Sequence, residues 1–242
     1  MTFLPNLKVS ASQLTPYAVV CGDPFRAAAY AELLNDAEQI AHSREYLIFR
    51  GSFDGVPLIV ASHGVGGPGA AVCFEELIRG GVQYMVRVGT AGSYVRDILP
   101  GSFVVSQAAV REDGLTAQLI NTRFPAVASP MVLQALETSL ASARVDYASG
   151  ITLTLDAFYP GVEDFPHDYY KRAGVLAVEM EIAPLYVIGS LRQIHTGAIL
   201  VTDGWADDEL AEVYNPDRSE VHQAVKRAGK VAMAALARIY AD

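Results

Sequence analysis

Short runs of strand-forming residues alternate with longer segments of helical period along almost the whole chain. The strand-forming runs are residues 17–21, 56–62, 83–89, 102–110, 176–182 and 196–202, and the helical segments are 27–34, 70–81, 130–143, 183–191 and 219–240. This alternation is typical of α/β proteins, in which helices cover a largely parallel or mixed sheet. We find no internal repeat, low-complexity tract or linker in the sequence, so we expect one domain over residues 1–242.

Composition and charge narrow the class of protein. The chain has 242 residues, 51% of them hydrophobic, which is enough for one domain with a substantial core. Its formal net charge of −9 argues against binding to nucleic acid or to an anionic membrane. Two widely separated cysteines, Cys21 and Cys73, favour a reducing compartment. With neither a signal-peptide pattern nor a long apolar run, we expect a cytoplasmic protein.

Polar side chains follow four of the predicted strands, at or just past the point where each strand ends. They are Arg26, then Arg87 with Thr90, then Glu179 with Glu181, and finally Asp203. In open α/β sheets the ligand crevice lies outside the carboxyl ends of the strands, so residues that are distant in sequence meet there. The sequence therefore predicts one site that contains two arginines, a hydroxyl and carboxylates.

Each arginine has two interpretations. Arg26, in GDPFR, is either a solvated residue in the first turn of a helix or a ligand for an anion that the helix N-terminus also attracts. Arg87 lies between valines, and an unpaired buried guanidinium is very costly. Its partner is either an acidic residue or an anion. We favour the anion, because residues 89–92 (GTAG) follow as a small-residue loop that can approach phosphate oxygens closely.

The carboxylates also have two interpretations each. Glu179 and Glu181 are either a solvated acid and an N-terminal helix acid, or they include a carboxylate that accepts hydrogen bonds from a sugar diol. Asp203 either caps a turn or, at the end of an apolar strand, has a raised pKa and donates a proton. We interpret His63 as a loop or interface histidine. The five histidines have no metal-binding spacing, so we expect no metal.

One glycine motif favours a different class of enzyme. Gly64, Gly66 and Gly69 match GxGxxG between a predicted strand and a predicted helix, which is the context of a dinucleotide-binding fingerprint. No Asp or Glu ends the next strand to bind a ribose diol, because Arg87 stands there. An oxidoreductase, most simply one that uses NADP, remains an alternative.

Eight short motifs together identify a family resemblance: GDPFR, SHGVGGPGAAVCFEEL, RVGTAGS, AVREDG, FPAVA, FYPG, VEMEIAPLY and TDG. In this order and spacing, the chain resembles the hexameric nucleoside phosphorylases over nearly its whole length. The resemblance implies a single-domain three-layer α/β/α sandwich around a mixed, partly closed sheet, usually assembled as a trimer of dimers. It also implies inorganic phosphate as co-substrate and no other cofactor.

The resemblance assigns site residues position by position. Phosphate would bind to Gly22, Arg26, Arg87 and Thr90, and to Arg44 lent across a dimer interface. The nucleoside would bind to Asn6, Phe158, Met180, Glu181 and Arg218. In that set Glu181 would take the 2′ and 3′ hydroxyls of the ribose, and Phe158 would face the base.

Departures and matches within the family bear on the substrate. Uridine phosphorylases read uracil with a Gln and an Arg after FYPG, where this chain has Val162 and Asp164. Asp203 stands where purine enzymes carry Asp, and Arg218 roughly matches an arginine that pairs with it. Asn6 replaces a His that crosses to the neighbouring subunit and binds the ribose 5′-hydroxyl, so the preference for a 5′ substituent stays open.

These observations predict a purine nucleoside phosphorylase in which a protonated Asp203 assists departure of the base. The alternatives are a uridine phosphorylase, a nucleosidase that uses water, and a non-catalytic nucleoside-binding relative. Residues 111–130 and 156–174 are candidate lids or site walls. The acidic residues Asp207, Asp208 and Glu209 form either a lid or a solvated loop.

Overall fold

The computed structural model describes residues 2–206 and 218–241, and within these residues ten strands form one mixed sheet. The strand order is β11-β10-β8-β12-β7-β3-β6-β5-β4, and β9 pairs with β8. The bounds are β3 (Tyr17–Cys21), β4 (Asn35–Ser43), β5 (Tyr46–Phe53), β6 (Val56–Ser62), β7 (Tyr84–Ser93), β8 (Phe103–Glu112), β9 (Ala126–Val127), β10 (Tyr147–Leu155), β11 (Ala177–Glu179) and β12 (His195–Trp205). A separate ribbon pairs β1 (Phe3–Leu4) with β2 (Val9–Ser10), and a 3-10 turn follows at Ala11–Gln13.

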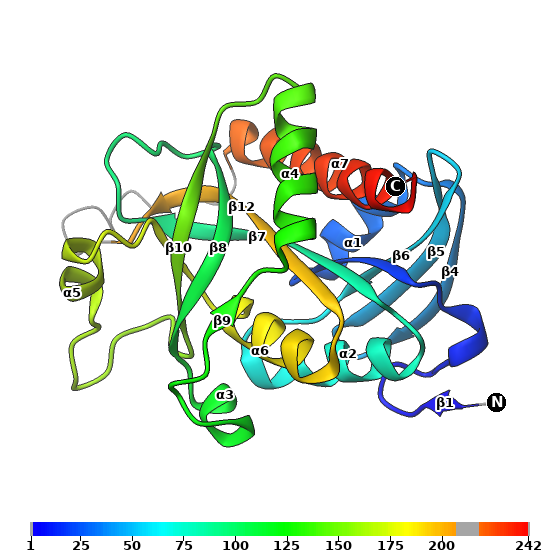
Figure 1. Cartoon of the computed structure of the whole chain (residues 1–242), viewed down its shortest axis with the longest axis horizontal. Coiled ribbons are helices and arrows are strands. Elements are labelled where there is room, and N and C mark those ends of the chain that lie inside the picture. Colours follow the sequence, from blue (N-terminus) through cyan, green and yellow to red (C-terminus); the bar gives the residue numbers. More distant parts are fainter. Residues whose placement is uncertain (1, 207–217, 242) are drawn as a thin grey trace.

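One end of the sheet closes on itself. β11 pairs in parallel with β10 and antiparallel with β7, so β7, β12, β8, β10 and β11 form a closed ring. The remaining strands β3, β6, β5 and β4 extend from β7 as an open wing (Figure 1). The prediction of a mixed, partly closed sheet is confirmed.

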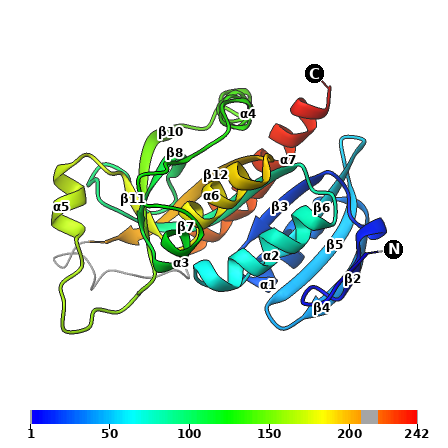
Figure 2. The ribbon, with the colours of Figure 1, turned by 60° about the horizontal axis from the view of Figure 1, so that its bottom comes forward.

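Helices cover both faces of the sheet. Helices α1, α4 and α7 lie on one face, and α2 and α6 lie on the other (Figures 1 and 2). The helices are α1 (Pro24–Ala31), α2 (Gly67–Arg79), α3 (Gly114–Leu119), α4 (Pro130–Ser142), α5 (His167–Arg172), α6 (Ile182–Arg192) and α7 (Ser219–Ala241). Side chains alternate along β3, where Val19 packs into the core under α1, α4 and α7, and Val20 packs into the core under α2 and α6. The predicted three-layer α/β/α arrangement is therefore confirmed.

Six strands lie outside the predicted strand runs: the two-residue strands β1, β2 and β9, and three longer strands of the sheet. β4 is exposed along most of its length and lies at the edge of the sheet, held by pairing with β5. Its residues NDAEQIAHS show no apolar alternation, because neither face is deeply buried. β5 and β10 were missed as well. These three longer strands are held in the sheet by hydrogen bonding to neighbouring strands, which the local sequence pattern does not indicate.

The two irregular segments contain short elements. Residues 111–130 hold α3 and β9, and residues 156–174 hold α5. Arg111 fastens the first segment, because its guanidinium donates to the carbonyl oxygens of Thr116 at 2.9 Å, Ile120 at 3.0 Å and Asn121 at 2.9 Å, and also to that of Phe124. This segment is therefore held against the end of β8.

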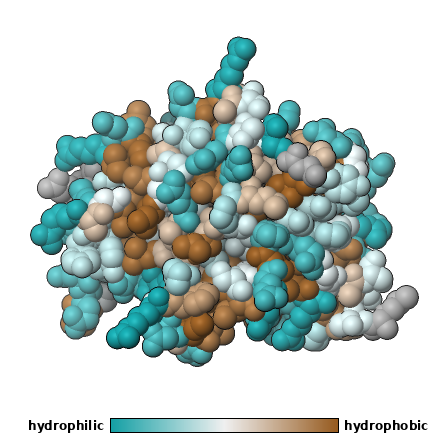
Figure 3. Space-filling view, viewed as in Figure 1, coloured by the Kyte–Doolittle hydropathy of each residue, from teal (hydrophilic) through white to brown (hydrophobic). Residues whose placement is uncertain are grey.

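Some large apolar side chains remain on the surface, among hydrophilic residues (Figure 3). Val127 on β9, Met131 on α4 and Ile151 on β10 are each between 44% and 47% exposed. Within residues 2–206 and 218–241, no helix combines the length and the apolar character needed to cross a membrane.

Candidate active site

The predicted polar residues lie within β7 and near the carboxyl ends of β3, β11 and β12, next to the first turns of α1 and α6. They form two groups on the two faces of β7. Thr90 shares the face of Val88, which packs under α1 and α7, whereas Arg87 shares the face of Met85, which packs under α2 and α6. The site therefore lies across the end of the central strand.

The GDPFR joint begins helix α1. Asp23 is its N-cap and accepts a hydrogen bond from the backbone N–H of Phe25 at 2.8 Å, and Pro24 occupies the first turn. Arg26 also lies in that turn, half-buried, with Nη1 3.4 Å from the Thr90 hydroxyl. Asp23 is thus explained by capping, and Arg26 is directed at the end of β7 and not into solvent.

Asp203 lies in a β-bulge near the end of β12. Thr202 pairs with Ala91 and Gly204 pairs with Gly92, so Asp203 is the extra residue. A bulge redirects one side chain away from the strand's alternation. Asp203 is 5% exposed, and this burial raises its pKa from 3.8 to about 6, although a hydrogen bond to Thr90 and the charge of Arg26 both act to lower it. The predicted raised pKa is consistent with this environment.

Arg87 is buried and paired with carboxylates. Its Nε and Nη2 donate to Glu179 Oε2 at 3.3 and 3.1 Å, and Nη2 also donates to Glu181 Oε2. The structure thus shows the salt bridge that was the alternative to an anion. Residues 89–92 were expected to form a loop, but they continue β7, because β12 pairs with them through Gly92 and beyond.

The two glutamates have different tasks. Glu179 caps α6, because its oxygens accept from the backbone N–H groups of Glu181 at 2.7 Å and of Ile182 at 2.9 and 3.0 Å. It also accepts from the Thr154 hydroxyl at 2.6 Å. Glu181 accepts from the N–H of Gly66 at 2.6 Å, and burial raises its pKa. Both glutamates are buried, so the expectation of a solvated acid is wrong.

The glycine motif leads into α2, which begins at Gly67. Gly64 and Gly66 both have positive φ, at 78° and 88°, which favours glycine. Through Gly66 the motif contacts Glu181. His63 lies in the loop between β6 and α2, as the sequence indicated, and it is fully buried there.

Comparison with known proteins identifies the family. The family model described as the phosphorylase superfamily matches residues 16–240. The chain belongs to the phosphorylase superfamily.

Individual relatives agree with this placement. The chain is 34% identical over 247 residues to a purine nucleoside phosphorylase of Plasmodium falciparum, covering 98% of this chain and 96% of the relative. It is also 34% identical over 211 residues to a uridine phosphorylase of Treponema pallidum, covering 82% and 81%. A solved structure of Toxoplasma gondii purine nucleoside phosphorylase in complex with immucillin-H superposes with a TM-score of 0.93 at 30% identity, covering 99% and 97%. The predicted membership in the nucleoside phosphorylases, which are pentosyltransferases, is confirmed.

Two further family positions, Gly22 and Met180, lie close to this cluster. Gly22 lies beside the glycine motif, since its carbonyl accepts from the N–H of Gly64 at 2.9 Å. Met180 is half-buried between the two glutamates in sequence. Arg218 is half-buried just before α7.

The other family positions lie at the surface of the chain. Phe158 is 56% exposed, and its ring packs edge-on against Tyr159. Arg44 is exposed at the turn between β4 and β5, with φ of 55°. Asn6 is exposed and donates from its side-chain amide to Glu76 at 2.6 Å. Arg44 and Asn6 are not brought to the cluster of their own chain by any described contact. Residues 207–209 lie outside the described residues.

Sequence reasoning missed two residues of the site. His63 contacts Arg87, and Thr154 holds Glu179 and also accepts from the N–H of Ala183 at 3.0 Å. The place of His63 in the site could have been predicted, because His63 adjoins the recognised glycine motif. The place of Thr154 could not, because it lies in a strand that the sequence pattern did not indicate.

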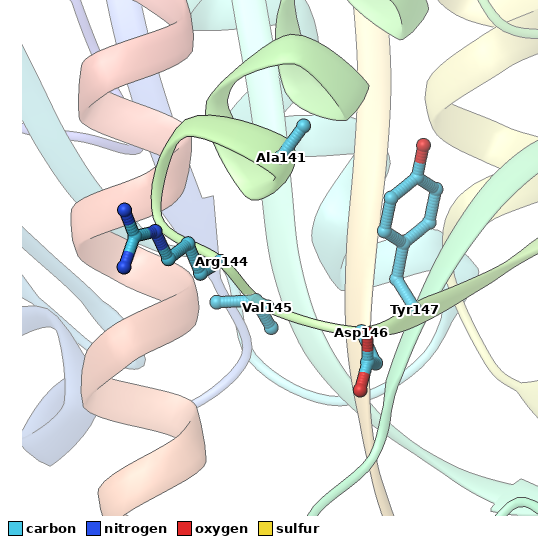
Figure 4. Close-up of a pocket in the computed structure, with 5 residues that line it drawn as sticks. All are labelled: Ala141, Arg144, Val145, Asp146 and Tyr147. Carbon is cyan, nitrogen blue, oxygen red and sulfur yellow. The ribbon is translucent and has the colours of Figure 1, made fainter.

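Two surface pockets lie elsewhere. One of about 500 Å³ is lined by Asp168, Lys171 and Arg172 of α5. One of about 400 Å³, where α4 leads into β10 (Figure 4), is lined by Ala141, Arg144, Val145, Asp146 and Tyr147. Tyr147 begins β10, whose opposite end carries Thr154. This second pocket is therefore separated from the site by the length of a strand.

Proposed function

We propose that this chain is a purine nucleoside phosphorylase, which cleaves purine ribonucleosides and deoxyribonucleosides reversibly to the free base and pentose 1-phosphate. The observation that carries the proposal is the position of Asp203. It is a buried carboxyl at a bulge, with a pKa of about 6, beside Thr90 and Arg26. A carboxyl of this kind can hold a proton near neutral pH and donate it to a leaving group.

A phosphate site at this position needs a cation in addition to Arg87. Arg87 faces two carboxylates, Glu179 and Glu181, so this group alone does not attract a dianion. Arg26 adds a half-buried cation on the other face of β7, and Gly22 and Thr90 flank it. A phosphate held between Arg26 and Arg87 would also raise the pKa of Asp203 further, because like charges disfavour ionisation.

In the proposed reaction, phosphate attacks C1′ of the sugar while the bond from C1′ to the purine nitrogen breaks. The transition state resembles an oxocarbenium ion, which the phosphate dianion stabilises from below the ring. Asp203 hydrogen-bonds to N7 or gives N7 its proton as negative charge grows on the base. The proton that hydrogen phosphate loses on forming the ester restores the carboxyl, so the enzyme returns to its starting state.

The sugar and base would lie along β11 and residues 156–166. Glu181 is proposed to take the 2′ and 3′ hydroxyls, with Met180 against the ribose. Phe158 is proposed to face the base, and Arg218 to pair with Asp203. The 56% exposure of Phe158 fits a position in contact with a bound base.

We further propose a homo-oligomer, with a dimer as the minimal active unit and a hexamer as the assembly. Arg44 and Asn6 lie on the surface and outside their own site, which fits a role in the neighbouring subunit's site. The exposed apolar side chains of Val127, Met131 and Ile151 are consistent with subunit contacts.

The continuous sheet supports a single domain, and the two buried free thiols, Cys21 and Cys73, fit a cytoplasmic location.

Uridine phosphorylase is the second candidate, because relatives of equal identity carry both names. Val162 and Asp164 argue against it. Neither side chain can donate the hydrogen bonds with which the Gln and Arg read uracil, and Val162 is 99% exposed.

The test is base release from inosine, guanosine, adenosine, 5′-methylthioadenosine and uridine, each with and without phosphate. We expect purine release only when phosphate is present. Preferential uridine cleavage would establish the second candidate, release without phosphate would indicate a nucleosidase, and no release would favour a non-catalytic relative.

A further inference from the structure

His63 is a buried histidine that contacts Arg87 and lies beside Gly22, two of the proposed phosphate residues. Its Nε2 lies 3.3 Å from Arg87 Nη1, and its Nδ1 lies 2.8 Å from the carbonyl oxygen of Gly64. A Cβ built on Gly22 would lie 3.9 Å from Cε1 of the His63 ring. The ring also packs edge-on against Phe74, with centroids 5.3 Å apart. His63 therefore fills the space between Gly22 and Arg87.

The contacts determine the tautomer of His63. A carbonyl oxygen can only accept, so Nδ1 carries the proton that it donates to Gly64. Nε2 then has a free lone pair, which faces a guanidinium N–H. Burial and the charge of Arg87 both hold the pKa of His63 well below its ordinary value of 6.5. The ring is thus a neutral acceptor.

His63 completes the enclosure of the Arg87 guanidinium. Glu179 accepts from the Nε and Nη2 edge, Glu181 accepts from Nη2, and His63 accepts from Nη1. A guanidinium has five N–H groups. These contacts use four of them and leave one N–H on Nη1 that no described residue accepts.

We propose that His63 is a positioning residue: as an obligatory acceptor for Nη1, it sets the plane of the Arg87 guanidinium so that the remaining Nη1 N–H is presented to phosphate. This inference rests on the proposed phosphate site. It gives the glycine motif a function in this family, because Gly64 orients His63 while Gly66 holds Glu181.

Two substitutions distinguish the role of His63 as a hydrogen-bond acceptor from its role in packing. His63→Asn retains a donor near the Nδ1 position, for Gly64, and places nothing at Nε2. His63→Gln extends an amide oxygen toward the Nε2 position and can accept from Arg87. His195→Asn is the control, because His195 makes a similar Nδ1 contact to Ser129 at 2.9 Å at the opposite end of β12.

Binding of inorganic phosphate is measured by calorimetry, together with the KM for phosphate and for inosine. We expect His63→Asn to weaken phosphate binding by about 10-fold or more, as for loss of a hydrogen bond to a charged group, with a smaller change in the KM for inosine. His63→Gln should recover most of the affinity, and His195→Asn should bind phosphate like the wild type. Equal losses in Asn and Gln, or equal losses for both substrates, would show a packing role and overturn the proposal.

A measurement on the unaltered chain covers the case in which the variants do not fold. Nitrogen-15 spectra of the His63 ring should show protonated Nδ1 and unprotonated Nε2, with an Nε2 shift that moves when inorganic phosphate is added. A protonated Nε2, or an Nε2 shift that phosphate leaves unchanged, would overturn the proposal. Failure of the wild-type chain to bind phosphate would instead overturn the proposed function, and the inference with it.

Discussion

The guanidinium of Arg87 lies directly over Gly89, two residues further along the same strand. A Cβ at position 89 would stand 2.7 Å from Arg87 Nη1 and 2.8 Å from Cζ and Nη2, which is closer than non-bonded atoms approach. Gly89 is therefore required by the position of Arg87 and not by backbone conformation, since its φ lies outside the left-handed region.

Gly89→Ala should displace Arg87 without removing its charge. We expect phosphate affinity to fall by about 10-fold or more, with a loss of about 1–3 kcal/mol in the free energy of unfolding from overpacking. Calorimetry with phosphate and denaturant unfolding measure the two effects. Gly161→Ala is the matched control, because nothing lies within 4 Å of a Cβ there. Unchanged phosphate binding in Gly89→Ala would show that Arg87 does not contact phosphate.

Asp203→Asn should nearly abolish turnover of inosine while leaving phosphate binding close to that of the wild type, because an amide cannot supply the proton. In the wild type, the active protonated form is lost as pH rises through the pKa of about 6, and bound phosphate moves that loss to higher pH. Rates and phosphate titrations across pH 5–9 check both points. Undiminished turnover in the variant would remove Asp203 from the mechanism.

Asp203→Asn, which should lower turnover, should raise the free energy of unfolding at neutral pH. Folding raises the pKa of Asp203 from 3.8 to about 6, so the folded chain favours the protonated carboxyl, and this contribution is present at low pH and lost as pH rises from about 4 to 6. Asp203→Asn stays uncharged, so at pH 7 it should be more stable than the wild type by up to about 3 kcal/mol. The gain should vanish near pH 4. Urea unfolding at the two pH values measures it, and equal gains at both would contradict the buried carboxyl.

Thr90→Val should raise the pKa of Asp203, because the Thr90 hydrogen bond acts to lower it. The decline of turnover at high pH should then move upward by up to about one pH unit. Thr138→Val is a suitable control, since Thr138 lies on the exposed side of α4 and, among the described residues, its hydroxyl donates to the carbonyl of Gln134. A pH profile like that of the wild type would show that Thr90 does not affect the pKa of Asp203.

Arg44 should act in the site of a neighbouring subunit. Arg44→Gln and Arg26→Gln should each have little activity alone, whereas their co-expressed mixture should regain about a quarter of wild-type activity. In an isologous dimer, half of the randomly formed pairs are mixed, and each mixed pair has one intact site. Tagged subunits purified in tandem allow the measurement. No recovery in purified mixed dimers would show that both arginines serve the same chain's site.

Much of this arrangement could be predicted from local pattern. The apolar runs of β3, β6 and β12 and the helical period of α2 and α7 predicted the layers, because each element buries a face that its own residues define. The polar residues at the strand ends predicted where a site would lie. The local pattern did not predict edge strand β4, because its residues are mostly exposed and its geometry comes from pairing with β5.

By itself the sequence determined the α/β layers, the family, and the set of polar residues at the carboxyl ends of the strands. Only the tertiary structure decided how those residues pair. Arg87 meets His63 from 24 residues before it and Glu181 from 94 residues after it. Asp203 becomes buried through a bulge against β7. Such partners are chosen by the folding of distant segments around one strand end, where burial makes an unpaired charge costly, and no local pattern encodes that choice.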